Sequence, residues 1–411
     1  MKTRNTLIKL LLFATAFLIN AGSIYAQDST SKDSSIVPEI TPEVAPAESQ
    51  FMMVGLATFG FVNQSTVNTL GGVKSTEKIN SLGDADRYEF SPMFLWRHGD
   101  KLLLEFEPSY TGTDGLGINW ADISYFVAPG LIVRGGYLVL PFGIYTKRLA
   151  AGWINKLASD PIGVDMAGSD FGVEIEGGFP MGNMKGSYDV SLSNGFQLNN
   201  DGTIQGVGIQ DINSGKTVCG RFSILPFSNS SLEIGVSALY GSLGSPQGAT
   251  FTNLDITSKK GPNTSMYAAD LNYVKNISPV QINIKGQYTT SMVSDQNYIN
   301  PLDSTQVYTF SNKTSAAFGQ ISVRPVGARN NVVKNLELAF RYANYTSPVN
   351  STWGQNYNEQ DIALDYWFTW RTVLKVAYEH IKTDGTSSVA TSGDQGSTLI
   401  NRMVIQFSTQ L

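Results

Sequence analysis

The stretch DIALDYWFTWRTVLKVAYEH, residues 361–380, places charged side chains one step away from large apolar ones. Asp361 and Asp365, for example, are interleaved with Leu364 and Trp367. Because successive side chains of a strand point to opposite faces, this alternation gives one apolar face and one charged face. A soluble core would make the burial of those charges costly. The stretch therefore predicts two strands, 360–368 and 372–381, between an apolar environment and water.

The same alternation recurs along the chain from Phe51 onward, in about sixteen segments. In LEIGVSALYG, residues 232–241, every second side chain is apolar, whereas a helix would need apolar residues three and four apart. The expected strands are 51–62, 86–96, 101–110, 118–127, 131–140, 171–179, 186–193, 217–225, 231–240, 265–274, 280–289, 314–324, 335–344, 360–368, 372–381 and 398–410.

The connections between these strands alternate between short and mostly long. The long ones are 63–85, 111–117, 141–170, 194–216, 241–264, 290–313, 345–359 and 382–397. An outer-membrane β-barrel with both termini in the periplasm requires short turns on one side and longer loops on the other. A soluble β-sandwich has no reason to sort its loops by side. We therefore predict an all-β fold, a transmembrane antiparallel β-barrel of about 16 strands, over residues 51–411.

The start of the chain has the features of an export signal. Lys2, Arg4 and Lys9 precede or flank a short apolar run over residues 10–19, and small residues lead up to Ala26. We expect residues 1–26 to be a signal peptide and the Pro-punctuated residues 27–50 to be a flexible periplasmic segment.

Composition excludes several function classes. The formal net charge is −5, and it becomes −8 once the three basic residues of the signal peptide are lost, so a nucleic-acid partner is not expected. The single Cys219 rules out an intramolecular disulfide. We find no metal-ligand spacing and no nucleotide-binding motif, and we expect no metal and no cofactor. Outer-membrane lipid is the expected surrounding of the barrel.

The strand phases also predict which side chains line the water-filled interior. Acidic residues predominate there in the earlier strands and basic residues in the later ones, which would produce a field across an open pore. Trp96, Trp367 and Trp370 are expected in an aromatic girdle beside the short turns. The predicted pore-lining residues are Arg134, Glu105, Glu107, Glu174, Glu176, Arg221, Arg341 and Arg402.

Two segments resemble known outer-membrane proteins. Residues 401–411, NRMVIQFSTQL, resemble a C-terminal assembly strand, although they end in Leu411 rather than an aromatic residue. Residues 121–163 resemble the porin family typified by the phosphate-selective porins O and P, in a strand pair that runs into Pro141-Phe142-Gly143 and a long loop. The resemblance implies a sixteen-stranded trimeric channel whose third loop folds inward. The arginine ladder of the phosphate channels is not present here.

The third long loop, 141–170, is therefore the expected pore constriction. It contains three bases and several acids, and a narrow low-dielectric passage lets such charges act on a passing ion. Lys147, Arg148 and Lys156 are expected to contact the solute, with Asp160 and Asp165 opposing them. An ordinary solvated loop is the alternative for these charges.

The function that follows is passive diffusion of small polar solutes or ions through a Gram-negative outer membrane. We expect no enzyme, since only His98 and His380 could act as a histidine base, in a barrel hydrolase for example. An energy-coupled importer would need a plug domain before the barrel. The expected segment 27–50 is too short for one, so this function is not expected. A non-conducting adhesin or structural barrel remains the alternative function.

Overall fold

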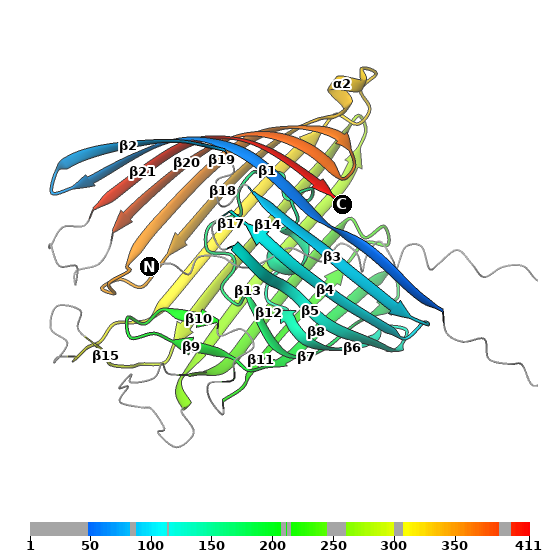
Figure 1. Ribbon diagram of the computed structural model, residues 1–411, viewed down its shortest axis with the longest axis horizontal. Coiled ribbons are helices and arrows are strands. Elements are labelled where there is room, and N and C mark those ends of the chain that lie inside the picture. The colour runs from blue at the N-terminus through cyan, green and yellow to red at the C-terminus, as the bar shows by residue number, and fades with distance from the viewer. Residues whose placement is uncertain are drawn as a thin grey trace, which may run out of the picture.

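The computed structural model describes residues 48–82, 88–112, 115–206, 211, 215–244, 260–299, 307–385 and 396–411. Sixteen antiparallel strands form a closed barrel (Figure 1). These strands are β1 (Ser49–Leu70), β3 (Glu89–His98), β4 (Leu102–Thr111), β5 (Gly115–Ala128), β6 (Leu131–Val139), β7 (Ser169–Met181), β8 (Met184–Ser193), β11 (Thr217–Leu225), β12 (Leu232–Gly244), β13 (Lys260–Ile277), β14 (Val280–Val293), β17 (Lys313–Arg324), β18 (Leu336–Thr346), β19 (Gln355–Thr369), β20 (Thr372–Gly385) and β21 (Ser397–Gln410).

The barrel closes because β1 pairs with both β21 and β3. Its register with β21 runs from Leu56↔Gln410 to Thr69↔Ser397, and its first ten residues pair with β3. Every backbone group of the wall can then find a partner without an open edge. The remaining elements are β2 (Val73–Leu82), β9 (Phe196–Leu198), β10 (Ile204–Gly206), β15 (Tyr298–Ile299), β16 (Val307–Tyr308), the π-helical turn η2 (Tyr145–Leu149) and α2 (Asn331–Lys334).

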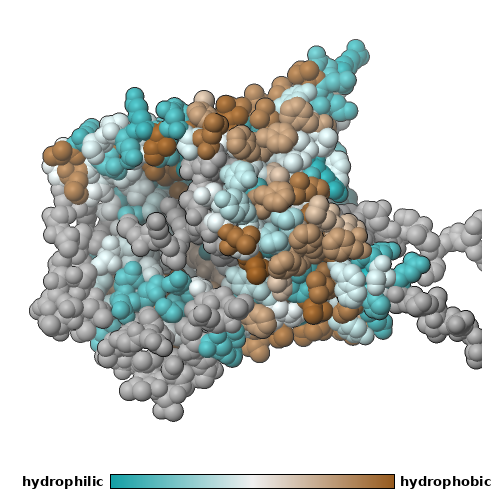
Figure 2. Space-filling model, in the orientation of Figure 1, coloured by the Kyte–Doolittle hydropathy of each residue, from teal (hydrophilic) through white to brown (hydrophobic). Residues whose placement is uncertain are grey.

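The stretch 361–380 has the predicted two faces. Its inward charged side chains, Asp361, Asp365, Lys375 and Glu379, are no more than 1% exposed, whereas outward Ile362, Leu364, Val376 and Tyr378 are 43–48% exposed. Figure 2 shows hydrophobic side chains gathered on the outside of the barrel wall in the same way, with hydrophilic residues at α2. The exterior is thus matched to an apolar solvent, as the alternation predicts.

The start of the first barrel strand and the end of the last one both lie beside short turns. The backbone N–H of Gly99, in the β3–β4 turn, donates to Glu48 O, and that of Gln410 donates to Arg371 O in the β19–β20 turn. The C-terminus and α2 accordingly lie at the same end in Figure 1. In the part of the chain described, no helix is both long and apolar enough to cross a membrane.

Two predicted loops are wrong in detail. Residues 63–82 are almost entirely strand, because β1 continues to Leu70 and forms a long hairpin with β2. Gly71 and Gly72, both with positive φ, make the tight turn that joins them. The predicted loop 111–117 is short, since Thr111 already pairs with Gly115. Residues 1–47 lie outside the described part, so the expected signal peptide and periplasmic segment stay predictions.

The aromatic girdle is also corrected. Trp370 is 67% exposed at the β19–β20 turn, as expected, but Trp367 is only 3% exposed and faces the interior. Its indole N–H donates to Glu337 Oε2 at 2.8 Å. Trp367 has the same parity along β19 as the inward Asp365, and strand alternation therefore places both inside.

Candidate functional site

Residues 140–168, between β6 and β7, fold into the barrel; we call them the inward segment. Side chains on the inner wall hold its backbone at several points. Gly143 N–H donates to Ser237 Oγ of β12 at 3.0 Å, and Tyr145 N–H donates to Gln287 Oε1 of β14 at 3.0 Å. The predicted loop 141–170 therefore crosses the interior and does not extend from the barrel end.

The turn that directs the segment inward depends on Gly143. Its φ is +66°, and a Cβ there would lie 2.5 Å from the amide of Gln287. A residue other than glycine would be strained and would displace Gln287, which accepts two of the segment's backbone N–H groups.

The apolar side chains of the inward segment pack on small residues of the wall. Leu157, fully buried, lies in a cluster with Ala339, Ala363 and Ala377, which are neighbours in register across β18, β19 and β20. A second cluster joins Ile144 and Leu149 to Phe318 and Ala343. Alanines at inward strand positions are the sequence signal for this packing surface. We predicted a polar inner face and therefore missed this signal.

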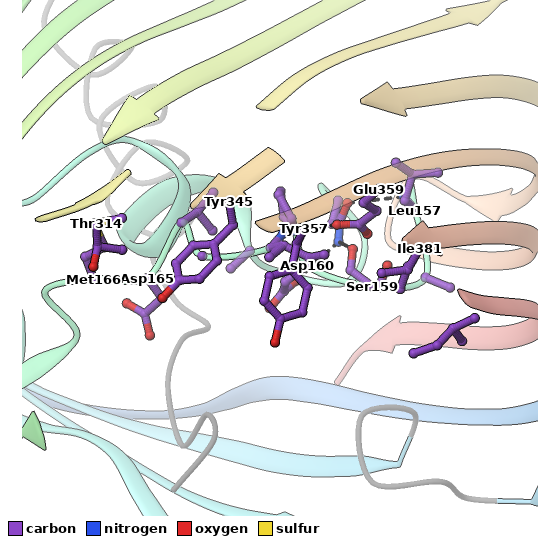
Figure 3. Close-up of a pocket in the computed structure, with 18 of the residues that line it drawn as sticks. Leu157, Ser159, Asp160, Asp165, Met166, Thr314, Tyr345, Tyr357, Glu359 and Ile381 are labelled. Carbon is purple, nitrogen blue, oxygen red and sulfur yellow. Dashed lines mark hydrogen bonds between the residues drawn. The ribbon is translucent and has the colours of Figure 1, made fainter. Parts of the chain in front are cut away.

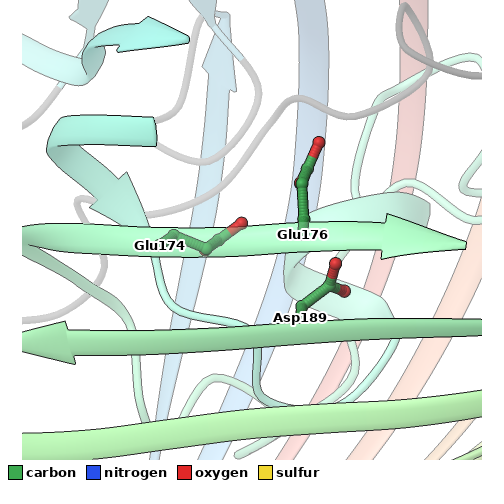
Figure 4. A group of neighbouring side chains, drawn as sticks. All are labelled: Glu174, Glu176 and Asp189. Atoms are coloured by element: carbon green, nitrogen blue, oxygen red, sulfur yellow. The ribbon is translucent and has the colours of Figure 1, made fainter. Parts of the chain in front are cut away.

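Lys147 is buried in an acidic part of the wall. Glu174 and Glu176 extend from β7 and Asp189 from β8, and oxygens of the three carboxylates lie within 4.8 Å of one another (Figure 4). The Lys147 ammonium contacts Glu174 Oε1 and lies 3.2 Å from Glu176 Oε2. Three carboxylates at this spacing are a donor set that could hold a metal ion, and here Lys147 supplies positive charge to it.

The other two bases of the inward segment also bind wall acids. Arg148 lies 2.8 Å from Glu233 Oε1 and 3.6 Å from Asp189 Oδ2. Lys156 lies 3.4 Å from Glu337 Oε2, with its ammonium 4.2 Å from the centre of the Trp367 ring. All three predicted solute-contacting bases thus make ion pairs with the wall.

Wall bases on β14, β18 and β20 instead donate hydrogen bonds to backbone carbonyls of the segment. Lys285 Nζ donates to Ile154 O at 2.7 Å, and Lys375 Nζ donates to Leu157 O at 2.9 Å. Arg341 has no exposed surface; it binds Ser159 O at 2.8 Å and lies 2.8 Å from Glu359 and 2.7 Å from Asp361.

A cavity of about 670 Å³ lies beside the inward segment. Asp160 and Asp165 line it, together with Tyr345 and Tyr357 from β18 and β19 (Figure 3). Lys147, Arg148 and Lys156 are not among the lining residues. That these three bases contact the solute therefore stays a prediction, whereas Asp160 and Asp165 line this cavity.

The two cavity carboxylates accept hydrogen bonds from neutral donors. Asp160 Oδ1 accepts from Tyr145 Oη at 2.7 Å and from Asn155 Nδ2 at 3.3 Å, and Asp165 Oδ1 accepts from Thr146 Oγ1 at 3.3 Å. Burial, and then the charge of Asp160, raise the pKa of Tyr145 well above its usual value, so the phenol stays a neutral donor. Among the described residues, no lysine or arginine forms an ion pair with either carboxylate.

The predicted pore-lining residues all lie on the inner wall, and most of them are paired there. Arg134 lies 3.1 Å from Glu176 and 3.9 Å from Glu105, and Glu107 accepts from Asn119. Arg221 lies 2.7 Å from Asp270. Arg402 contacts Glu379 and, alone of the eight predicted residues, also lines the cavity. The charges predicted to set up a field across an open pore are therefore largely paired with each other or with the inward segment.

The two histidines have polar neighbours outside the cavity lining. His98 Nδ1 lies 2.9 Å from Ser49 Oγ at the short-turn end, and His380 Nδ1 lies 2.7 Å from Asn401 Oδ1. Neither contact joins a histidine to a carboxylate as in a catalytic triad.

No family profile matches the chain, and no curated protein matches it by sequence. Its structure is similar to that of the outer-membrane channel DcaP of Acinetobacter baumannii, with a TM-score of 0.52 and 12% identity over 88% of this chain and 97% of that one. An anion-selective porin from Comamonas acidovorans follows at a TM-score of 0.49, with 13% identity over 89% of this chain and all of the other.

OmpF of Salmonella typhi matches with a TM-score of 0.46 and 12% identity, over 87% of this chain and 97% of that one. Identity this low establishes the fold alone. The resemblance to phosphate-selective porins stays a prediction that rests on residues 121–163. The chain has the sixteen-stranded barrel fold of Gram-negative outer-membrane porins.

Proposed function

We propose that this chain is a passive channel in the outer membrane of a Gram-negative bacterium, admitting small polar solutes and ions. Two features support the proposal: an apolar outer wall suited to lipid and a polar cavity inside a closed barrel. The inward segment is its constriction, because it crosses the interior and is held by both sides of the wall. A homotrimer is proposed from the family resemblance alone.

The residues that line the cavity also predict which ions the channel prefers. The segment's bases are paired with wall acids, whereas Asp160 and Asp165 face the cavity without an ion pair among the described residues. In a narrow passage of low dielectric, such carboxylates attract cations and repel anions when they are ionised. Burial raises the pKa of Asp165 to about 7, so its share of the charge grows as the pH rises above neutral. We therefore propose a preference for cations.

Reconstitution of the purified protein in a planar lipid bilayer tests the channel function. Discrete conductance steps in KCl are expected, and their absence would favour a non-conducting adhesin or structural barrel. To test whether the cavity is the path, an Asp160→Cys variant is treated with a bulky charged thiol reagent, which should lower the conductance.

The matched control is Asp100→Cys, which places the thiol on a fully exposed side chain in the β3–β4 turn. The native Cys219 is buried and should react little in either variant. Equal loss of conductance in the two variants would contradict the assignment of the cavity as the path.

A further inference from the structure

The cavity has an aromatic wall that the channel function does not by itself require. Tyr345 and Tyr357 are directly paired in register on β18 and β19, and their ring centres lie 5.5 Å apart in an edge-to-face arrangement. Trp353, in the connection between the same two strands, also lines the cavity. Three aromatic residues from β18, β19 and their connection thus line the cavity.

The protein holds these rings in place. Gly163 of the inward segment has a φ of +70° and approaches Tyr345 so closely that a Cβ would lie 2.2 Å from the ring. The Tyr357 hydroxyl donates to Gln355 Oε1, and Trp353 Nε1 donates to Asp201 O at 2.9 Å. Because their polar tips are engaged elsewhere, Tyr357 and Trp353 present mainly aromatic surface to the cavity.

The charges beside these rings are acceptors. Asp160 and Asp165 lie in the same cavity as Tyr345 and Tyr357 (Figure 3). The two bases that line it are committed, since Lys375 is 1% exposed and donates to Leu157 O, and Arg402 contacts Glu379. A solute therefore meets aromatic faces and carboxylates together.

From this arrangement we infer that the cavity is a binding subsite for small organic cations, such as amines and quaternary ammonium compounds. Aromatic faces attract such cations through their quadrupole, and a carboxylate adds a charge interaction. An anion would meet two carboxylates, and a neutral sugar could donate hydroxyl hydrogen bonds to them but would lack the charge–charge attraction. The inference rests on the proposed channel function, because the cavity lies inside the barrel beside the inward segment.

Block of the KCl current by tetraethylammonium tests this inference, with glucose as a neutral probe. The wild type is expected to be blocked by tetraethylammonium at concentrations where glucose has little effect. In an Asp160→Asn, Asp165→Asn variant, and separately in Tyr345→Leu, Tyr357→Leu, the half-blocking concentration should rise about fivefold, the effect of losing one exposed cation–π or charge contact.

Tyr110→Leu is the matched control, because Tyr110 is 48% exposed on the outer face of β4. The half-blocking concentration of tetraethylammonium for this variant should stay at the wild-type value. Tyr345 packs on Gly163, so its replacement can prevent the double variant from inserting into the bilayer. In that case Tyr357→Leu alone replaces the double variant in the test. Equal block by glucose, or block that neither variant weakens, would overturn the subsite while KCl conductance upheld the channel. A barrel without any KCl conductance would refute both.

Discussion

The two halves of the inward segment treat their charges in opposite ways. In the first half, residues 145–156, every base is paired with an acid of the wall. In the second half, residues 157–166, the carboxylates Asp160 and Asp165 line the cavity without an ion pair among the described residues. Wall donors bind backbone carbonyls in both halves. We propose that the first half fixes the segment in place and that the second sets the charge that a solute meets.

The comparison implies that the net charge of a pore loop is a poor guide to selectivity. The segment carries more bases than acids, yet each of its bases is paired with an acid of the wall. What counts is the charge that remains unpaired after docking, and this depends on which wall residues lie opposite each side chain.

The largest expected effect comes from reversing the docking charges, in a Lys147→Glu, Arg148→Glu variant. New carboxylates would lie beside Glu174, Glu176 and Glu233. Breaking buried pairs costs about 3–5 kcal/mol, so the inward segment should detach from the inner wall. We expect a larger and noisier single-channel conductance and a lower temperature for the heat-induced gel shift.

The control for this variant is Lys74→Glu, Lys78→Glu on the exposed hairpin strand β2, which makes the same change in net charge. Its conductance and gel shift should stay near those of the wild type. If both variants conduct alike, the first half of the segment does not hold the constriction.

An intermediate effect is expected from Arg341→Lys, which keeps the charge but loses the planar fork. Arg341 binds Glu359, Asp361 and Ser159 at once, and an ammonium cannot reproduce this geometry. Loss of a buried, charged hydrogen bond costs about 1–3 kcal/mol, measured as a shift in thermal unfolding. Arg97→Lys, whose partner Asp100 is fully exposed, should shift unfolding by less than about 1 kcal/mol.

A smaller effect is expected on the free energy of unfolding, when Gly163→Ala is compared with its control Gly182→Ala. Both glycines have positive φ, at +70° and +64°, so the backbone strain is similar. A Cβ at Gly163 would strike the Tyr345 ring, whereas one at Gly182 meets nothing within 4 Å. Gly163→Ala should therefore be less stable by about 1 kcal/mol beyond its control, the lower end of overpacking costs. Equal stabilities would contradict the close packing of Tyr345 on the segment.

Strand periodicity predicted most of the fold, because the alternation of faces is a local property of the chain. The strand 217–225 was predicted with the same bounds as β11, and the inward charges of 361–380 were assigned correctly. The extension of β1 and the whole of β2 were missed because their exposed, polar sequence lacks apolar alternation.

The candidate site was predicted only in part. Residues 141–170 were expected inside the barrel, but an irregular segment has no periodicity to show where its side chains point. Lys147 pairs with acids of β7, whose position opposite it follows from the docking of the segment and not from local sequence. The rings of Tyr345 and Tyr357 meet through strand register, which sequence pattern leaves undetermined.

The most direct test of the central claim is the reversal potential across a KCl gradient. If the unpaired charge at the constriction comes from Asp160 and Asp165, the wild type should favour K⁺, and Asp160→Asn, Asp165→Asn should reduce that preference by about fivefold, the effect of roughly 1 kcal/mol for a unit charge at 4 Å in water. Asp100→Asn, in the exposed turn, should leave the potential unchanged. A wild type that favours Cl⁻, or a double variant with the wild-type potential, would contradict the account.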